Sequence, residues 1–468
     1  MLRSAKRVVM SLLFLVSVGY GRPNAVPINF QHLQNLTERI LLAGDSVDIV
    51  HIYSNYPSYQ WTAAAESGEE GIACVDDAAR AALLYIRYFD LTGDTSALNH
   101  VRGLIAFVQH METTDGMFYN FIHADHSINA DGRTSYKSFG WWGVRGMWCL
   151  SAAYRVFRNR DSVLAASLRI GIVRTFPHID SLLKSYNTFK AVKGYRVPQW
   201  LLYGSGSDVT SALILGLSEY YQATHDRNVG TYIRKFAQGL ITMQDGNLKT
   251  APYGLHRSWE TMWHMWGNDQ TAALAVAGKL LRDRRMISSG ELEAQGFFSR
   301  LLIEGFRKEI DISSDTSVKE FDQIAYGIRP MVSGLLRLYD ATRNSNYRVM
   351  AGLAASWLFG DNAAHAAMYD SATGICFDGI RDSATINKNS GAESTIEALW
   401  TLVDLGFYPQ TRPYLHFSKL HVRKTPEHEF ATFGDSAGDE VSVILDLRRG
   451  TFSVLEGEES KLFRMRNR

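Results

Sequence analysis

Two adjacent carboxylates open the part of the sequence that is richest in potential chemistry. Asp76 and Asp77 stand in "CVDDAARAALLYIRYF", where they begin a long apolar run that predicts a helix. Neighbouring carboxylates repel, and the repulsion can keep one of them protonated. One aspartate is enough to cap a helix, because its oxygen accepts free backbone N–H groups and the helix dipole favours its charge. The second aspartate, with Arg80 one turn later, favours an acidic site, more for Asp77 than for Asp76, with capping as the alternative for both.

A second acidic segment is "NSGAESTIEALW", in which Glu393 begins another apolar run. Asn389 precedes it and is expected to contact a ligand. The segment also fits the S-x-x-E capping box, in which Ser390 and Glu393 would satisfy helix N–H groups reciprocally. A catalytic role and a capping role for Glu393 are both open. Glu397, one turn later on the same face, is expected to be a supporting ion-pair partner.

A third acid stands among tryptophans in "SWETMWHMWGNDQ". The spacing predicts that the three indoles share one face of a helix. A flat indole covers the apolar face of a pyranose while acids and amides bond its hydroxyls, so this combination is typical of a sugar platform. A buried aromatic stripe is the alternative. The residues concerned are Asp269 and Glu260, with Trp259, Trp263 and Trp266.

The same pairing of aromatic and polar side chains recurs at two other points in the chain. Trp141 and Trp142 begin "WWGVRGMWCLSAAYRVF", while Asp322 and Tyr326 lie at the start of "DQIAYGIRPMVSGLLRLYD". By the same reasoning we expect these four side chains to contact a bound sugar.

The sequence offers no metal or cofactor motif, and we expect neither. "HADH", which ends at His126, is interpreted as a polar surface loop, because no zinc pattern, P-loop or dinucleotide fingerprint accompanies it. Cys74, Cys149 and Cys376 are each flanked by apolar residues and are expected to be buried thiols, with one disulfide left open.

These segments recur in a way that indicates the fold. A polar cluster opens an Ala- and Leu-rich helix, a second amphipathic helix returns, and a glycine-containing loop leads to the next cluster. The six starts recur every 54 to 70 residues, which is longer than helical solenoid repeats. The pattern resembles an all-α (α/α)6 toroid over residues 28–408, closed by a helix over Phe30–Gly44. The starts lie at Asp77, Trp141, Asp208, Asp269, Gln323 and Glu393.

The two ends of the chain differ from this ring. Short alternating runs after Pro409, such as "VSVILDLRRG", predict a small β-rich tail over residues 409–468. Basic residues before the short apolar run "VVMSLLFLVSV" predict a signal peptide over residues 1–21. We therefore expect an exported protein, periplasmic or secreted, with no membrane insertion after the signal is removed. The 49 basic and 48 acidic residues form no basic block, which argues against a nucleic-acid partner.

A toroid with acidic helix starts and an aromatic-rich funnel is similar to the (α/α)6 glycoside hydrolases. The resemblance implies an oligosaccharide or polysaccharide substrate and an inverting hydrolysis. One carboxyl group would protonate the leaving oxygen, and a second, about 6.5–9.5 Å away, would activate water. Asp77 and Glu393 are the expected pair, with Asp269 and then Glu260 as contenders. Placement at a helix start suits the base, whereas burial or a neighbouring charge suits the acid, so the two roles stay open.

Three other functions can be compared with hydrolysis at this point. A polysaccharide lyase on the same toroid would use Tyr119, Asn120, His123, Tyr326 and Arg329 around an acidic sugar, although acidic helix starts disfavour such a ligand. A sugar epimerase is disfavoured by the predicted export. A glycan-binding toroid without chemistry is also open, because a fold alone does not define an activity.

Overall fold

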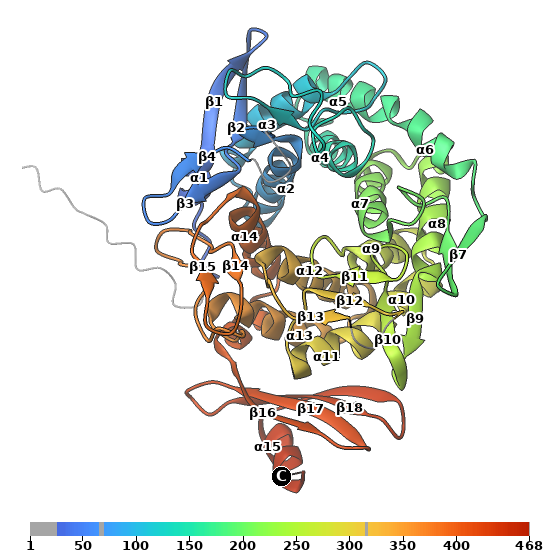
Figure 1. Cartoon of the computed structure of the whole chain (residues 1–468), viewed down its shortest axis with the longest axis vertical. Coiled ribbons are helices and arrows are strands. Elements are labelled where there is room, and N and C mark those ends of the chain that lie inside the picture. The colour runs from blue at the N-terminus through green and yellow to red at the C-terminus, as the bar shows by residue number, and fades with distance from the viewer. Residues whose placement is uncertain (1–25, 65–69, 314–316, 468) are drawn as a thin grey trace, which may run out of the picture.

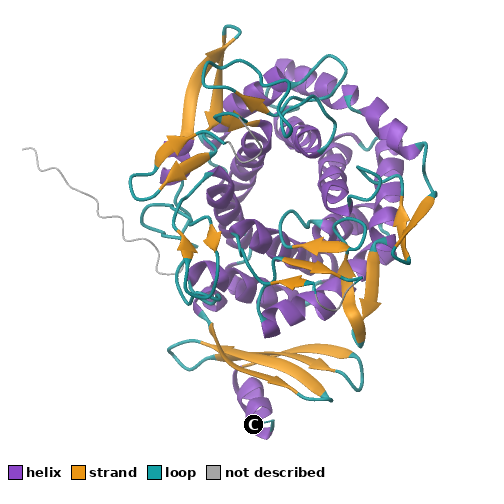
Figure 2. Ribbon diagram, viewed as in Figure 1, coloured by secondary structure: helices purple, strands orange, loops and turns teal. Residues whose placement is uncertain are grey.

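Six long helices form a closed inner ring, which Figures 1 and 2 show end-on. The computed structural model describes residues 26–64, 70–313 and 317–467. Each inner helix packs against the next one along the chain, and the last packs against the first. The inner helices are α2 (Val75–Thr92), α4 (Trp141–Phe157), α7 (Ser207–Thr224), α9 (Gln270–Leu281), α12 (Ala325–Thr342) and α14 (Ala392–Gly406).

A second layer of helices returns outside this ring, and each outer helix packs on the inner helix before it. Four of the inner helices end at a residue with positive φ, the conformation that reverses the chain at a helix C-terminus. The outer helices are α3 (Ala97–Met111), α5 (Ser162–Arg174), α8 (Arg227–Thr242), α10 (Arg284–Glu293) and α13 (Ser345–Ala355). Shorter helical pieces are α6 (Phe176–Leu183), η1 (Ala294–Phe298), α11 (Ser299–Glu304) and η2 (Ser356–Phe359).

The (α/α)6 toroid that the sequence predicts is therefore confirmed. Each of the six predicted starts falls within two residues of the beginning of an inner helix. The sequence makes these helices inner because they are apolar on every side. In α2, the small side chains of Ala78, Ala79, Ala81 and Ala82 are all buried, which lets neighbouring helices approach on both flanks.

The prediction for Phe30–Gly44 is wrong in part. Only α1 (Gln31–Leu36) is helical, and it packs on α14. The following residues form an antiparallel hairpin of β1 (Thr37–Leu42) and β2 (Asp45–Val50), and β2 packs on α3. Ala43 and Gly44 both have positive φ, the geometry of a tight two-residue hairpin turn. The turn ends the helix early, and the sixth outer position is shared by α1 and η3 (Pro409–His416).

Short two- and three-stranded sheets stand mainly in the loops that lead into the inner helices. They give these loops a fixed path at the mouth of the ring. The strands are β3 (Tyr53–Asn55), β4 (Gln60–Thr62), β5 (Ala73–Cys74), β6 (Phe121–Ile122), β7 (Phe189–Val192), β8 (Tyr195–Pro198), β9 (Gln244–Asn247), β10 (Thr250–His256), β11 (Met262–His264), β12 (Glu309–Asp311), β13 (Val318–Lys319), β14 (Gly379–Ile380) and β15 (Ile386–Asn387).

The C-terminal segment forms a four-stranded antiparallel sheet below the ring in Figure 1. Its order follows the chain: β16 (Ser418–Lys424), β17 (His428–Gly434), β18 (Glu440–Asp446) and β19 (Thr451–Glu456). One side contacts α11 and α13, and α15 (Gly457–Arg466) packs on the sheet. Among the described residues, none of the helices combines the length and apolar character needed to cross a bilayer. The predicted signal peptide, residues 1–21, lies outside the described residues.

Candidate active site

A cavity of about 670 Å³ lies at the N-terminal ends of the inner helices. Its walls come from α2, α4, α12 and α14 and from the loops that precede them. Seven of the twelve predicted site residues line it. Those seven are Asp76, Asp77, Trp141, Trp142, Trp266, Tyr326 and Glu393.

Neither aspartate of the adjacent pair caps α2. The N-cap is Cys74, whose sulfur accepts the Asp77 backbone N–H at 3.4 Å. The two carboxylates are thus available for other contacts while they still lie in the first helical turn. All three cysteines are free and buried, as the sequence predicts.

The capping box expected at α14 does not form either. Its N-cap is Gly391, with no side-chain cap. The Ser390 hydroxyl contacts the Thr395 hydroxyl, while Asp378 accepts bonds from the Gly391 N–H and the Ser394 hydroxyl. The Glu393 carboxylate is therefore free to face the cavity.

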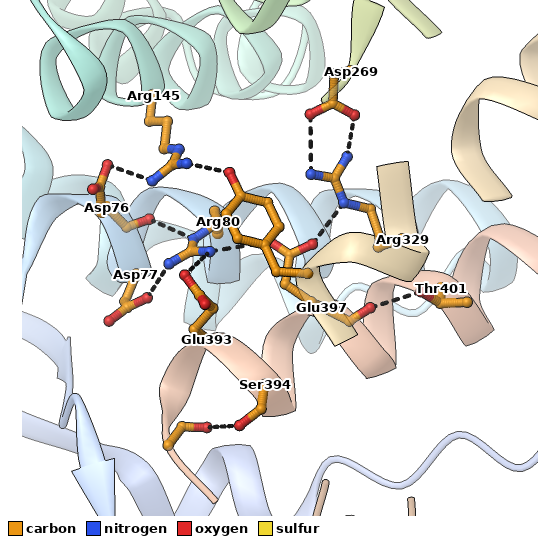
Figure 3. A network of polar contacts seen from close by, with 12 residues as sticks. Asp76, Asp77, Arg80, Arg145, Asp269, Arg329, Glu393, Ser394, Glu397 and Thr401 are labelled. Carbon is orange, nitrogen blue, oxygen red and sulfur yellow. Dashed lines mark hydrogen bonds and ion pairs between the residues drawn. The ribbon is translucent and has the colours of Figure 1, made fainter. Parts of the chain in front are cut away.

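One buried guanidinium, Arg80, joins the carboxylates of α2 and α14 (Figure 3). Its Nη2 lies 2.6 Å from Asp77 Oδ1, and its Nη1 lies 3.0 Å from Glu393 Oε2 and 3.2 Å from Glu397 Oε1. The Asp77 and Glu397 side chains are almost completely buried, whereas that of Glu393 is 46% exposed. Of the three acids, Glu393 is the one that presents its carboxyl group to the cavity.

A second guanidinium holds Asp76. Arg145 Nη1 lies 2.9 Å from Asp76 Oδ1, and Arg145 Nη2 donates a hydrogen bond to the Tyr326 hydroxyl. The Asp76 side chain keeps 20% exposure, more than that of Asp77. Figure 3 shows Asp76 and Glu393 on either side of Arg80.

Asp269 does not reach this cavity. Arg329 clamps it with Nη1 at 2.5 Å and Nη2 at 3.0 Å, while Arg329 Nε bonds Glu397 at 2.6 Å. Both Asp269 and Arg329 are buried, and they line a second cavity of about 620 Å³ further along the ring axis. Asp269 is predicted to lie with the other acids because it begins an inner helix. Its carboxylate instead binds Arg329 and lines the second cavity.

Burial shifts the protonation of these acids. Although 46% of the Glu393 side chain is exposed in the cavity, the protein around its carboxyl group displaces water and raises its pKa above the usual glutamate value; Arg80 opposes this shift, and the nearby Asp77 and Glu397 add to it. Burial likewise raises the pKa of Asp77 against the opposing charge of Arg80. Burial raises the pKa of Asp269 against the opposing charge of Arg329.

The tryptophan-rich segment before α9 is not the helix that its spacing predicts. It contains the short strand β11, in which successive side chains point to opposite sides. Trp263 is therefore buried against Phe297, whereas His264 stacks on Trp266 at 4.0 Å between ring centroids. Only Trp266 of the predicted platform faces the cavity, where it joins Trp141 and Trp142.

Three further predicted residues lie away from the cavity wall. Glu260 pairs with Lys190 at 2.8 Å, and Asp322 pairs with Lys308 at 3.2 Å. Asn389 accepts a hydrogen bond from the backbone N–H of Tyr56. These placements argue against direct sugar contacts at the bottom of the cavity.

Sequence reasoning missed three polar side chains of the site. Glu70 and Asp378 line the cavity but stand in loops, with no apolar run to draw attention to them. Arg145 lies four residues after the start of α4, as Arg329 does after the start of α12, and Arg80 has a similar place in α2. This recurrence of an arginine near the start of three inner helices could have identified Arg145 from the sequence. Among the lyase candidates, only Asn120 and Tyr326 line the cavity.

Comparison with known proteins supports the fold and names no family. No protein-family model and no curated protein matches the sequence. Among solved structures, cellobiose 2-epimerase from Bacillus thermoamylovorans is 9% identical, with a TM-score of 0.53 over 78% of this chain and 94% of that one.

Two further solved structures have the same architecture. An inactive variant of an α-1,6-mannanase from a Salegentibacter species, in complex with α-1,6-mannotetraose, is 10% identical, with a TM-score of 0.51 over 82% of this chain and 98% of that one. A sugar epimerase from a ruminal bacterium is 12% identical, with a TM-score of 0.51 over 76% and 91%. The chain thus shares the (α/α)6 toroid fold with these three structures.

Proposed function

We propose that this protein is an exported glycoside hydrolase that cleaves an oligosaccharide or polysaccharide with inversion. One observation carries the proposal: a half-exposed Glu393 and a partly exposed Asp76, from neighbouring inner helices, line one indole-lined cavity and are paired with different arginines. Acid–base cleavage of a glycosidic bond needs a protonated acid and an ionised base in the same site.

Glu393 is the general acid in this proposal. Its pKa is raised by burial and by two neighbouring acids, and its carboxyl group is accessible. A raised pKa keeps the proton on the acid at the pH of turnover, so that it can be given to the leaving oxygen.

Asp76 is the proposed base and replaces Asp77 in the pair expected from sequence, in which the roles of acid and base are open. Its carboxylate is partly exposed and held by Arg145, which fixes its direction. Asp77 is almost completely buried, and its carboxylate forms an ion pair with Arg80. Asp77 therefore acts as a positioning residue for the arginine that orients Glu393.

The compared structures support an activity on sugars. Two are described as sugar epimerases and one as a mannanase. The mannanase is described as inactive with two consecutive aspartates replaced. Two consecutive aspartates also begin the first inner helix here, which supports a role for this pair.

Epimerisation and elimination fit the cavity less well than hydrolysis. Both need a base that removes a proton from carbon, and no histidine lines the cavity among the described residues. Tyr326 is the other candidate, but burial raises its pKa well above the usual tyrosine value despite the nearby Arg145 and Arg80. A phenol in that state is a poor base near neutral pH.

Product analysis in water enriched in heavy oxygen tests the proposal. The purified chain is incubated with neutral oligosaccharides, including α-1,6-linked mannose and β-1,4-linked glucose series. Hydrolysis places one heavy oxygen at the new reducing end, and early proton NMR spectra show the inverted anomer. Unsaturated products without label would indicate a lyase, and a changed sugar of unchanged mass and chain length would indicate an epimerase. Either result would overturn the proposal.

Export is proposed on the N-terminal pattern alone. Expression of the full chain in a secreting host, followed by N-terminal sequencing of the mature protein, tests it. Cleavage close to Gly21 is expected, whereas an intact N-terminus in the cytoplasm would contradict it.

A further inference from the structure

Exposed aromatic side chains are confined to one face of the molecule. Among the described residues, the exposed aromatic rings belong to Tyr56, Trp61, Tyr136, Tyr203 and Trp259, and all five stand in loops that lead into inner helices. Of the exposed large aliphatic residues, only Val318 of β13 stands in such a loop among the described residues, and the others lie on the N-terminal hairpin, α5 and the C-terminal segment. An exposed apolar group of this kind on one face marks a binding surface.

Two of these rings contact a tryptophan of the cavity wall directly. Tyr136 packs edge-on against Trp142, with 5.2 Å between ring centroids. The Tyr203 hydroxyl accepts the backbone N–H of Trp141 at 3.0 Å.

Trp259 is linked through His264 to Trp266, the third tryptophan of the cavity wall. It packs on His264 at 4.5 Å, and His264 in turn stacks on Trp266 at 4.0 Å. Each cavity tryptophan is therefore linked to an exposed aromatic residue: Trp142 by ring contact, Trp266 through His264, and Trp141 through its backbone N–H. The three outer rings precede α4, α7 and α9, which lie side by side along one arc of the ring in Figure 1.

Tyr203 combines a structural contact at its hydroxyl with a largely exposed ring. Its φ is 56°, in the left-handed region that costs a bulky residue free energy, and its side chain is 55% exposed. The bond from the Trp141 N–H to the Tyr203 hydroxyl offsets this strain and fixes the side chain, and the exposed ring beside it is open to a ligand.

The charges beside these rings are already paired. Lys137 bonds Asp115 at 2.7 Å next to Tyr136, and Glu260 bonds Lys190 at 2.8 Å next to Trp259. The surface thus offers ring faces with no strong excess of charge, which suits the apolar faces of neutral sugars.

We propose that Tyr136, Tyr203 and Trp259 form outlying subsites that stack successive units of a neutral glycan chain leaving the cavity. This inference rests on the proposed glycosidase function and names its substrate class: chains longer than the cavity holds. Tyr56 and Trp61 are not part of this track, because their ring contacts are with Tyr59, Lys388 and His51 and not with the tryptophans of the cavity wall or a ring stacked on them.

The test compares chain lengths within one neutral oligosaccharide series, from two to eight units. Tyr203→Ala and Trp259→Ala are expected to reduce the ratio of kcat/KM for long chains to that for short chains by about tenfold each. Tyr136→Ala should reduce it in the same way, and Tyr136→Phe should restore it because the ring alone stacks. Trp61→Ala is the matched control, since Trp61 and Tyr136 are equally exposed at 45%, and it should leave the ratio unchanged.

Binding separates failure of the track from failure of the proposed activity. Glu393→Gln carrying each ring substitution is titrated with the same series by calorimetry. Length-dependent binding that falls with the ring variants supports the track even if no glycan is cleaved. Variants that affect all lengths equally overturn the track and leave the hydrolase standing. A wild-type protein that neither binds nor cleaves a broad set of neutral glycans overturns both.

Discussion

At the scale of single residues, the main feature of the site is that three carboxylates share one guanidinium. Arg80 meets Asp77, Glu393 and Glu397, so none of the three has a guanidinium to itself. Loss of water around the carboxyl group is the largest cause of the raised pKa of Glu393, and repulsion from Asp77 and Glu397, which Arg80 neutralises only in part, adds to it.

Replacing the proposed acid tests this account. Glu393→Gln should lower kcat by about 10²–10⁴-fold, because an amide cannot give a proton to the leaving oxygen. Glycan binding should persist, since the amide keeps the shape of the side chain. Rates are measured with natural glycosides and with aryl glycosides, whose good leaving groups need less acid help. An equal loss on both substrates would contradict an acid role for Glu393.

Glu112, on the outside of the ring, makes a separate contribution to the pH dependence of the free energy of unfolding. Its nearest cation, Arg174, is 3.9 Å away, and its Oε1 has no hydrogen-bond partner among the described residues. Burial raises its pKa from 4.5 to about 7. The folded chain therefore binds this proton more tightly than the unfolded chain does, and stability falls as the pH rises from about 4.5 to about 7.

Glu112→Gln should remove this loss. We expect the variant to be more stable than wild type at pH 8 by on the order of 1–3 kcal/mol, with little difference at pH 4.5. Denaturant unfolding at both pH values measures the difference. A stabilisation that is the same at both would rule out the titration of Glu112 as its cause.

At the scale of elements, the loops before the inner helices set the side chains of the cavity. Gly267, in the loop before α9, has φ 64°, and a Cβ there would lie 2.8 Å from the Tyr326 hydroxyl and 3.3 Å from the Trp141 ring. Gly93, at the end of α2, has φ 74° with nothing near its missing side chain. The two glycines share a backbone conformation and differ in their surroundings.

Alanine at these two positions separates strain from displacement. Gly93→Ala and Gly267→Ala should each lower stability by about 1 kcal/mol through the positive φ. Only Gly267→Ala should also lower kcat/KM, by about tenfold or more, because it pushes on Tyr326 and Trp141. Thermal unfolding and kinetics on the same preparations give both quantities. A similar loss of activity in both variants would contradict the close fit around Gly267.

The elements also show what the sequence could and could not predict. Polar clusters before apolar helices identified every inner helix, because burial on all sides leaves a strong local pattern. The tryptophans before α9 have spacings that fit a helix or a turn followed by a strand, and pairing with β12 decides the outcome. The direction of Asp269 and the partners of Asp76 depend on contacts across the ring, which no local pattern contains.

At the scale of the whole molecule, a layer of buried ion pairs divides the ring axis. Glu397 bonds Arg80 on one side and Arg329 on the other, and it is completely buried. The candidate active site lies on the Arg80 side, and the second cavity lies on the Arg329 side. A glycan in the active site therefore meets a closed base rather than a through channel.

The second cavity contains a matching arrangement. Asp404 is buried and bridges Arg87 at 2.7 Å and Arg337 at 3.0 Å, much as Glu397 bridges its two arginines. Of Glu397 and Asp404, it is Glu397 that helps to raise the pKa of Glu393. Glu397 and Asp404 thus have similar structural roles, but only Glu397 of the two affects the pKa of the proposed catalytic acid.

Neutralising each acid in turn distinguishes the two roles. Glu397→Gln should destabilise the fold by about 3–5 kcal/mol, because it leaves the buried Arg80 and Arg329 short of a partner. Asp404→Asn should destabilise it less, because Arg87 and Arg337 are partly exposed to water. Glu397→Gln should also lower the pKa of Glu393 and move the alkaline limb of kcat/KM to lower pH, since a neighbouring negative charge is lost. Asp404→Asn should leave that limb in place. If Glu397→Gln does not fold, Glu397→Asp retains the charge and should keep the limb near its wild-type position. The same shift in both neutral variants would show that the layer acts on the site only through stability.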